Sequence, residues 1–120
     1  KKEQFMNNVS FDNTDSPAIS LMCKRHDYEY NSATGTFVTG DWVISEKKQR
    51  ELLGQKVTLT EFKQTEAYLG GRITGFIPSG RKTAQKQVKV VFQPDPRLTG
   101  DRTHSNHKGW GTGRSVCYLD

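Results

Sequence analysis

The sequence predicts a mainly β (α+β) fold, a small open β-barrel with one short helix. Runs of alternating apolar and polar residues, the pattern of half-buried strands, recur along the 120-residue chain between turn residues. One run, residues 67–77, carries three glycines within six positions, and glycines inside a strand mark the bulge or bend that lets a small sheet curve. Only the stretch 46–53 has a helical pattern, which argues against the regular strand–helix alternation of a doubly wound sheet.

In the first part of the chain, the residue pattern predicts an arm followed by short strands. In order, we expect an arm or edge strand at 1–16, a turn at 13–17, a strand at 18–24, a hairpin of 28–30 and 36–38 around a turn at 31–35, and a second turn at Gly40-Asp41. A barrel over 17–120 would then complete a single domain.

The expected helix at 46–53 has both a start and a stop signal. Ser45 can accept a hydrogen bond from the first turn, and Gly54 follows the last turn. We expect Leu52 and Leu53 to dock this helix on the barrel.

The strand expected at 55–62 shows strict alternation. Its pattern directs Val57 and Leu59 toward the core and the polar side chains toward solvent. The outward residues would be Lys56, Thr58 and Thr60.

The glycine-rich strand at 67–77 is expected to bend and to form the floor of a binding surface. Alternation places Ile73, Gly75 and Ile77 on one face and Arg72, Thr74 and Phe76 on the other. After it we expect a basic loop at 78–83, a strand at 87–93, a long loop at 94–114 and a last strand at 115–119.

The basic residues are concentrated in one part of the chain. The net charge is +5, but residues 72–114 hold nine Lys and Arg against two acids, a net +7 that leaves −2 for the rest. Such asymmetry indicates a face for a polyanion, with a merely solubilising surface as the alternative. The expected phosphate contacts are Arg72, Arg81, Lys82, Lys86, Arg102, Lys108 and Arg114.

The loop at 104–114 predicts a stacking site. Glycines flank Trp110, so the backbone can approach a ligand while the indole presents a flat face to a base. The alternative is that Trp110 plugs the mouth of the barrel.

Two residue pairs have the spacing of metal ligands, Cys23-x-x-His26 and His104-x-x-His107, with Cys117 as an extra thiol. They do not form a standard zinc signature, so we expect no cofactor. The favoured prediction for Cys23 and Cys117 is two buried thiols in an intracellular, cytoplasmic protein, and a single disulfide is the alternative.

Catalysis is the second function class. His104 or His107 could act as a general base beside Asp95 or Asp101, as in a small nuclease or hydrolase. No phosphate-binding loop, nucleophile elbow or paired-carboxylate spacing is present, so we expect binding rather than catalysis.

Three segments together resemble the PUA-like superfamily, especially its EVE, YTH and ASCH-type members. They are Gly40-Asp41-Trp42-Val43-Ile44 before the short helix, Gly54-x-x-Val57-x-Leu59 after it, and the stretch from Ala67 to Phe76. The resemblance covers about Thr39 to Phe92. It implies an open β-barrel that binds RNA or modified DNA, often by flipping a base into an aromatic pocket. Trp42, Tyr68 and Phe76 would line that pocket, while the arm and the loop at 104–114 have no counterpart.

The sequence therefore predicts a nucleic-acid-binding module for DNA or RNA, with recognition of a modified base as the finer expectation. No apolar run approaches the ~18 residues of a membrane span. Because the chain starts at Lys1, we expect a piece of a longer protein, fused to or partnered with an effector domain. A protein–protein module with a basic face is the third class.

Overall fold

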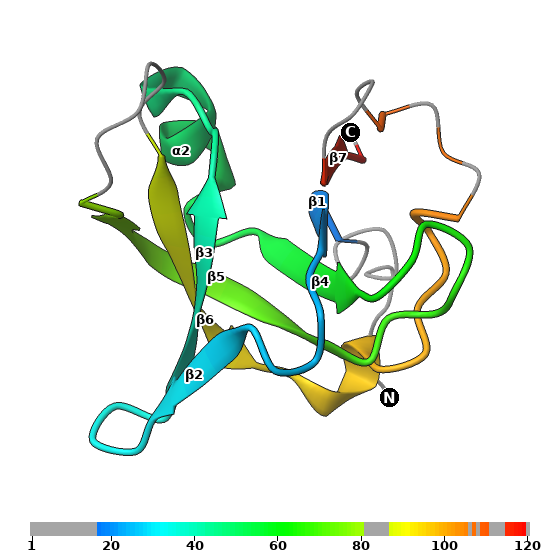
Figure 1. Ribbon diagram of the computed structural model, residues 1–120, viewed down its shortest axis with the longest axis horizontal. Helices are drawn as coiled ribbons and strands as arrows, with labels where there is room; N and C mark the ends of the chain where they lie inside the picture. The colour runs from blue at the N-terminus through cyan, green and yellow to red at the C-terminus, as the bar shows by residue number, and fades with distance from the viewer. Residues whose placement is uncertain (1–16, 81–86, 106, 108, 111–114, 120) are drawn as a thin grey trace, which may run out of the picture.

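The computed structural model describes residues 17–80, 87–105, 107, 109–110 and 115–119. In these residues the chain forms seven strands, one α-helix and one 3-10 helix (Figure 1). The elements are β1 (Ile19–Met22), β2 (Tyr28–Asn31), β3 (Thr36–Trp42), α2 (Glu46–Leu52), β4 (Lys56–Thr60), β5 (Leu69–Pro78), β6 (Val88–Pro94), η1 (Pro96–Leu98) and β7 (Val116–Tyr118). The expected mainly β class is confirmed.

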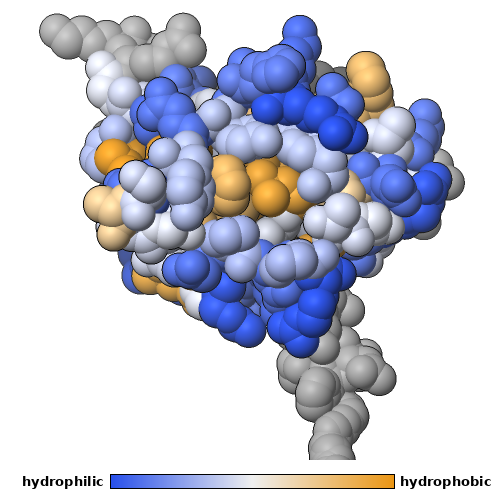
Figure 2. Space-filling view, turned by 90° about the horizontal axis from the view of Figure 1, so that it is seen from below, coloured by the Kyte–Doolittle hydropathy of each residue, from blue (hydrophilic) through white to orange (hydrophobic). Residues whose placement is uncertain are grey.

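The strands make one mixed sheet in the order β2-β3-β6-β5-β4-β1-β7. Strands β1 and β4 run parallel, with Ile19 opposite Val57, and all other neighbours are antiparallel. The sheet curves without closing, so it is an open barrel with β2 and β7 at its two edges (Figure 1). From below, apolar side chains lie in a hollow that hydrophilic side chains surround (Figure 2).

The core lies on the concave side of this sheet. It consists of fully or nearly fully buried apolar side chains from β1, β3, β4, β5, β6 and β7, together with Ile44 and with Leu52 of α2. The largest fully buried side chain is Phe92, whose ring stacks with that of Phe37 at a centroid distance of 5.7 Å. Strand β6 buries Val88, Val90 and Phe92, as its alternation predicts.

Strand β4 is buried on both faces, so the expected outward direction of Lys56, Thr58 and Thr60 is wrong. All five residues of the strand are buried. The hydroxyl of Thr58 donates to that of Ser20 at 2.9 Å across the parallel pair. The cause is the chain after β6, which folds back over this part of the sheet and removes its second face from solvent.

Two backbone hydrogen bonds fix that fold-back. The amide of Ala67 donates to the carbonyl of Asp101 at 2.9 Å, and the amide of Gly100 donates to the carbonyl of Ala67 at 2.7 Å. Leu98 is buried and lies against Gly70. The first part of the expected loop at 94–114 therefore contains η1, and its residues 98–101 pack on the sheet.

The glycines of β5 have two different roles. A Cβ on Gly71 would lie 2.0 Å from the carbonyl oxygen of Gln93, whereas a Cβ on Gly75 would meet nothing within 4 Å. The register against β6 shifts between Ile73 and Gly75. This irregularity breaks the expected alternation, because Ile73 is buried while Ile77 is 45% exposed.

The hairpin of β2 and β3 forms as expected, but Gly40 and Asp41 lie inside β3 and do not form a turn. The strand is irregular there, since its register against β6 shifts between Thr39 and Trp42. Lys89 of β6 covers Gly40 and pairs with the Asp41 carboxylate at 3.3 Å.

Helix α2 begins and ends where its capping signals predict. Ser45 accepts a hydrogen bond from the amide of Lys48, and Gly54 has a φ of 83° just beyond the helix. Leu52 is buried, but Leu53 is 50% exposed, so only the first of the two leucines docks the helix. No helix in the described part of the chain is long and apolar enough to cross a membrane.

Candidate nucleic-acid interface

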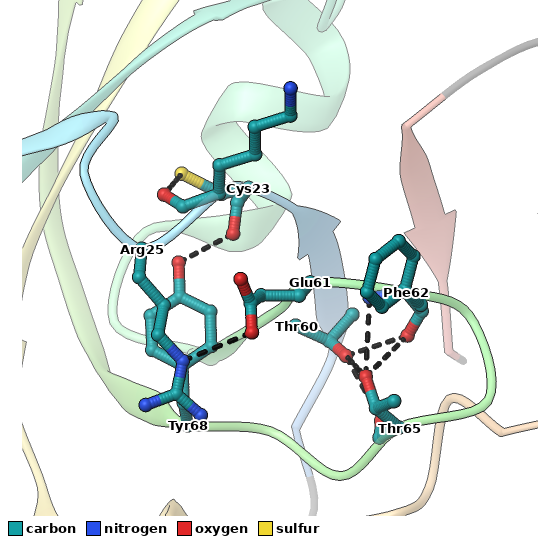
Figure 3. A network of polar contacts seen from close by, with 8 residues as sticks. Cys23, Arg25, Thr60, Glu61, Phe62, Thr65 and Tyr68 are labelled. Atoms are coloured by element: carbon teal, nitrogen blue, oxygen red, sulfur yellow. Dashed lines mark hydrogen bonds and ion pairs between the residues drawn. The ribbon is translucent and has the colours of Figure 1, made fainter.

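The loop between β4 and β5, residues 61–66, has a fixed backbone. The buried Thr60 hydroxyl donates to the carbonyl of Phe62 at 2.7 Å. The Thr65 hydroxyl accepts from the amide of Phe62 at 3.2 Å and lies 3.0 Å from the Thr60 hydroxyl (Figure 3). These bonds tie the loop to the end of β4 and leave the Phe62 ring 65% exposed at the surface.

His104 fixes the same loop from the other side. Its Nε2 lies 2.6 Å from the carbonyl oxygen of Thr65. Because a carbonyl oxygen only accepts, Nε2 is the donor in this contact. The side chain is fully buried, and Nδ1 has no hydrogen-bond partner among the described atoms.

Trp110 packs on His104 and is oriented by it. The indole N–H donates to the carbonyl of His104 at 3.0 Å, and the two rings meet edge to face at 6.2 Å. A bridge to Cys117 of β7 fixes the backbone of Trp110. The ammonium of Lys63, from the 61–66 loop, lies 5.6 Å from the centre of the half-buried indole.

A second cation–aromatic pair lies at the other end of the loop. The Arg25 guanidinium is 4.9 Å from the centre of the Tyr68 ring and bonds Glu61 at 3.1 Å (Figure 3). The Tyr68 hydroxyl donates to the carbonyl of Cys23 at 2.5 Å, and its ring stacks on Tyr28 at 6.2 Å. Burial, followed by the neighbouring Cys23 thiol, raises the pKa of Tyr68, so the hydroxyl stays a donor.

We call this surface the aromatic strip. Its aromatic members are Tyr28, Tyr68, Phe62 and Trp110, its cations are Arg25, Lys63 and Arg102, and its acids are Glu61 and Glu66. Arg102 donates to the carbonyl of Gln64 at 3.3 Å and lies 3.9 Å from the Glu66 carboxylate. The strip thus gathers rings and charges around one loop that is bonded from both sides.

Of the expected phosphate contacts, the structure places Arg102 in the strip, together with the expected stacking residue Trp110. Arg72 lies elsewhere, where its guanidinium donates to the carbonyl of Gly54 near the end of α2. The remaining candidates, Arg81, Lys82, Lys86, Lys108 and Arg114, lie outside the described residues.

The three residues expected to line a base pocket have different surroundings. Trp42 is 8% exposed, and its indole N–H donates to the Thr39 hydroxyl at 2.9 Å. Phe76 lines a shallow hollow of about 430 Å³ beside α2 that contains neither Trp42 nor Tyr68. Only Tyr68 belongs to the aromatic strip.

The metal-ligand candidates form no cluster in the described residues. No three His, Cys, Asp or Glu side chains lie close enough there to hold an ion. The Cys23 thiol faces the carbonyls of Lys24 and Asp27, and His26 is exposed. His107 accepts the Gly109 amide through Nδ1 at 2.9 Å, with the Cys117 thiol 3.8 Å away.

The two cysteines are free and buried, as the favoured prediction has it, and they do not form a disulfide. Burial raises the pKa of both thiols, that of Cys117 to about 11. His104 has its Nε2 engaged and no exposed surface, so this structure gives it no access to a substrate as a general base.

Sequence reasoning missed Arg25, Phe62 and Lys63. Phe62 was read as the end of a strand, although a large apolar residue within the polar run Glu61-Phe62-Lys63-Gln64 is the signal that could have marked it. Nothing in the local sequence links Lys63 to Trp110, because the fold-back after β6 creates that contact.

Comparison with protein-family models, curated proteins and solved structures finds no match to this chain. The resemblance to the PUA-like superfamily therefore stays a prediction. The function has to be argued from the surface just described.

Proposed function

We propose that this domain binds nucleic acid, with the aromatic strip as its contact surface. The observation that carries the proposal is Phe62, a 65% exposed aromatic ring on a hydrogen-bonded loop between two cation–aromatic pairs. Exposed rings beside Lys and Arg are the groups that stack on bases and meet phosphates. Hydrogen bonds hold the loop in shape before any ligand arrives, which lowers the entropic cost of binding.

The proposal includes recognition of a modified base, but Trp42, Tyr68 and Phe76 do not together form the pocket for it. Buried Trp42 is an unsuitable stacking surface, so Tyr68 and the rings of the strip are the favoured contacts. A protein partner for the same surface is the competing outcome of the experiment. No contact supports catalysis by His104, because its imidazole binds the Thr65 carbonyl of the 61–66 loop.

The test is fluorescence-anisotropy binding to single- and double-stranded DNA and RNA, with and without methylated bases. Phe62→Ala should weaken binding by ~1–3 kcal/mol, the usual contribution of one stacked base. Leu53→Ala is the matched control, since Leu53 is 50% exposed at the end of α2. The proposal fails when the unaltered protein binds no oligonucleotide at low salt, or when both variants weaken binding equally.

A further inference from the structure

We infer that the aromatic strip takes single-stranded nucleic acid, and that stacking on bases rather than neutralisation of phosphates supplies most of its affinity. This inference rests on the proposed function and specifies its substrate class. Bases inside a duplex are stacked on one another and offer no free face to a side chain. A surface with the exposed ring of Phe62 and three half-buried rings beside it is therefore complementary to a strand with unpaired bases.

The ring faces of the strip are fixed by hydrogen bonds at their polar ends. The Trp110 indole N–H bonds the His104 carbonyl, and the Tyr68 hydroxyl bonds the Cys23 carbonyl. Both polar atoms point into the protein. Arg25 and Tyr28 lie against the Tyr68 ring and Lys63 lies over the Trp110 ring, so Phe62 has the freest ring surface for a ligand. Rings oriented in this way lose little rotamer freedom when a base stacks on them.

Phe62 differs from these two rings because only its backbone is fixed. Its amide and its carbonyl both bond the Thr60–Thr65 hydroxyl pair. The side chain has no polar end and is 65% exposed, so it can adjust to bases of different size. This combination of fixed and adjustable rings favours stacking that tolerates different sequences.

The strip has few charged side chains, and most of them pair with an opposite charge. They are therefore poorly suited to bind a row of phosphates. Three cations, Arg25, Lys63 and Arg102, face the two acids Glu61 and Glu66, so the strip carries a net +1. Arg25 bonds Glu61 at 3.1 Å, and Arg102 lies 3.9 Å from Glu66. Each phosphate neutralised on a single strand contributes roughly 0.7 to the slope of log affinity against log salt. We therefore expect the strip itself to contribute a slope of about 0.7.

The experiment compares a labelled single strand with the duplex of the same sequence at several salt concentrations. The variants are Phe62→Ala and Lys63→Gln, with Leu53→Ala and Arg50→Gln as controls on α2. We expect the single strand to bind at least tenfold more tightly than the duplex. Phe62→Ala should weaken it roughly 5- to 150-fold without changing the salt slope, and Lys63→Gln should lower the slope by about 0.7.

Trp110 supplies an independent readout. The chain has two tryptophans, and Trp42 is 8% exposed, so quenching of emission by a bound single strand reports a base stacked on Trp110. In a Trp42→Phe background the quench should persist. This measurement does not require Trp110 to be replaced, so it is unaffected by any folding defect that Trp110→Ala causes.

The outcomes distinguish the inference of single-strand stacking from the proposed nucleic-acid binding. Duplex binding as tight as single-strand binding, or a Phe62→Ala variant that binds as the unaltered protein does, overturns the inference and leaves nucleic-acid binding standing. A salt slope well above about 0.7, with no quench of Trp110 emission, overturns it in the same way. Absence of binding to every oligonucleotide ends the proposed function itself.

Discussion

His104 Nε2 lies 2.6 Å from the carbonyl oxygen of Thr65, and through this contact the chain after β6 fixes the loop after β4. The two residues are 39 positions apart in sequence. Two rings of the strip, Phe62 and Trp110, depend on this contact or on its neighbours. Phe62 belongs to the fixed loop, and Trp110 bonds the His104 carbonyl.

Removing the His104 contact should loosen the loop. His104→Leu removes the imidazole donor and leaves the Thr65 carbonyl with the Thr60 hydroxyl alone, so we expect a loss of ~0.5–1.5 kcal/mol in the free energy of unfolding. His104→Gln can place an amide N–H near the position of Nε2 and should lose less. Urea denaturation of the two variants gives the comparison, and equal losses would contradict a role for the hydrogen bond.

The Thr65 hydroxyl should matter as much as the histidine. Thr65→Val keeps the shape but removes the acceptor of the exposed Phe62 amide, which water can replace, so stability should fall by ~0.5–1.5 kcal/mol. Thr74→Val on β5 is the control, because its exposed hydroxyl makes only a 3.4 Å contact with the Val91 carbonyl. Thermal unfolding of both proteins tests this, and a loss no larger than that of the control would refute it.

The two glycine sites in β5 should respond with opposite signs. Gly71→Ala forces a Cβ to 2.0 Å from the Gln93 carbonyl, and we expect a loss of ~3 kcal/mol or more, at the upper end of overpacking costs. Gly75→Ala meets nothing within 4 Å and should be neutral or stabilising by up to ~1 kcal/mol, since alanine restricts the unfolded chain. Thermal melts followed by circular dichroism would compare the two variants. A larger loss of stability for Gly75→Ala than for Gly71→Ala would contradict the prediction.

Stability should fall in alkaline solution. Burial raises the pKa of Cys117 from 9.0 to about 11, so the folded state holds this proton more tightly than the unfolded state does. The contribution is complete below pH 9 and is lost as the pH rises from about 9 to about 11. Cys117→Ala should flatten this part of a stability–pH profile measured by urea denaturation. An unchanged slope would show that Cys117 is not responsible.

The sequence predicted the local features well and the long-range ones poorly. Strands β1, β2, β3, β6 and β7, the Ser45 cap and the bent β5 follow from alternation, turn residues and glycine, which are properties of neighbouring positions. The double burial of Thr58 and the pairing of Lys63 with Trp110 depend on the fold-back after η1. No local pattern encodes that contact.

Trp110 was found because glycines surround it, and one of them has a definite role. A Cβ on Gly109 would lie 2.0 Å from the carbonyl oxygen of Tyr118, so only glycine permits this approach to β7. Phe62 was missed because a strand-like alternation continues up to it. Trp110 and Phe62 differ in how deeply they are buried, which the periodicity of the sequence does not show.

The parallel pairing of β1 with β4 has a consequence for how the chain folds. Strand β1 pairs with residues about 38 positions later and, through β7, with residues almost 100 positions later. Contacts of such long range are slow to form, because loop-closure entropy is lost before any contact is gained. As a ribosome releases the chain, the apolar edge of β1 has no antiparallel partner until Val116–Tyr118 emerges. Nascent or truncated chains without β7 would present that edge to other chains, so this strand is where aggregation should begin.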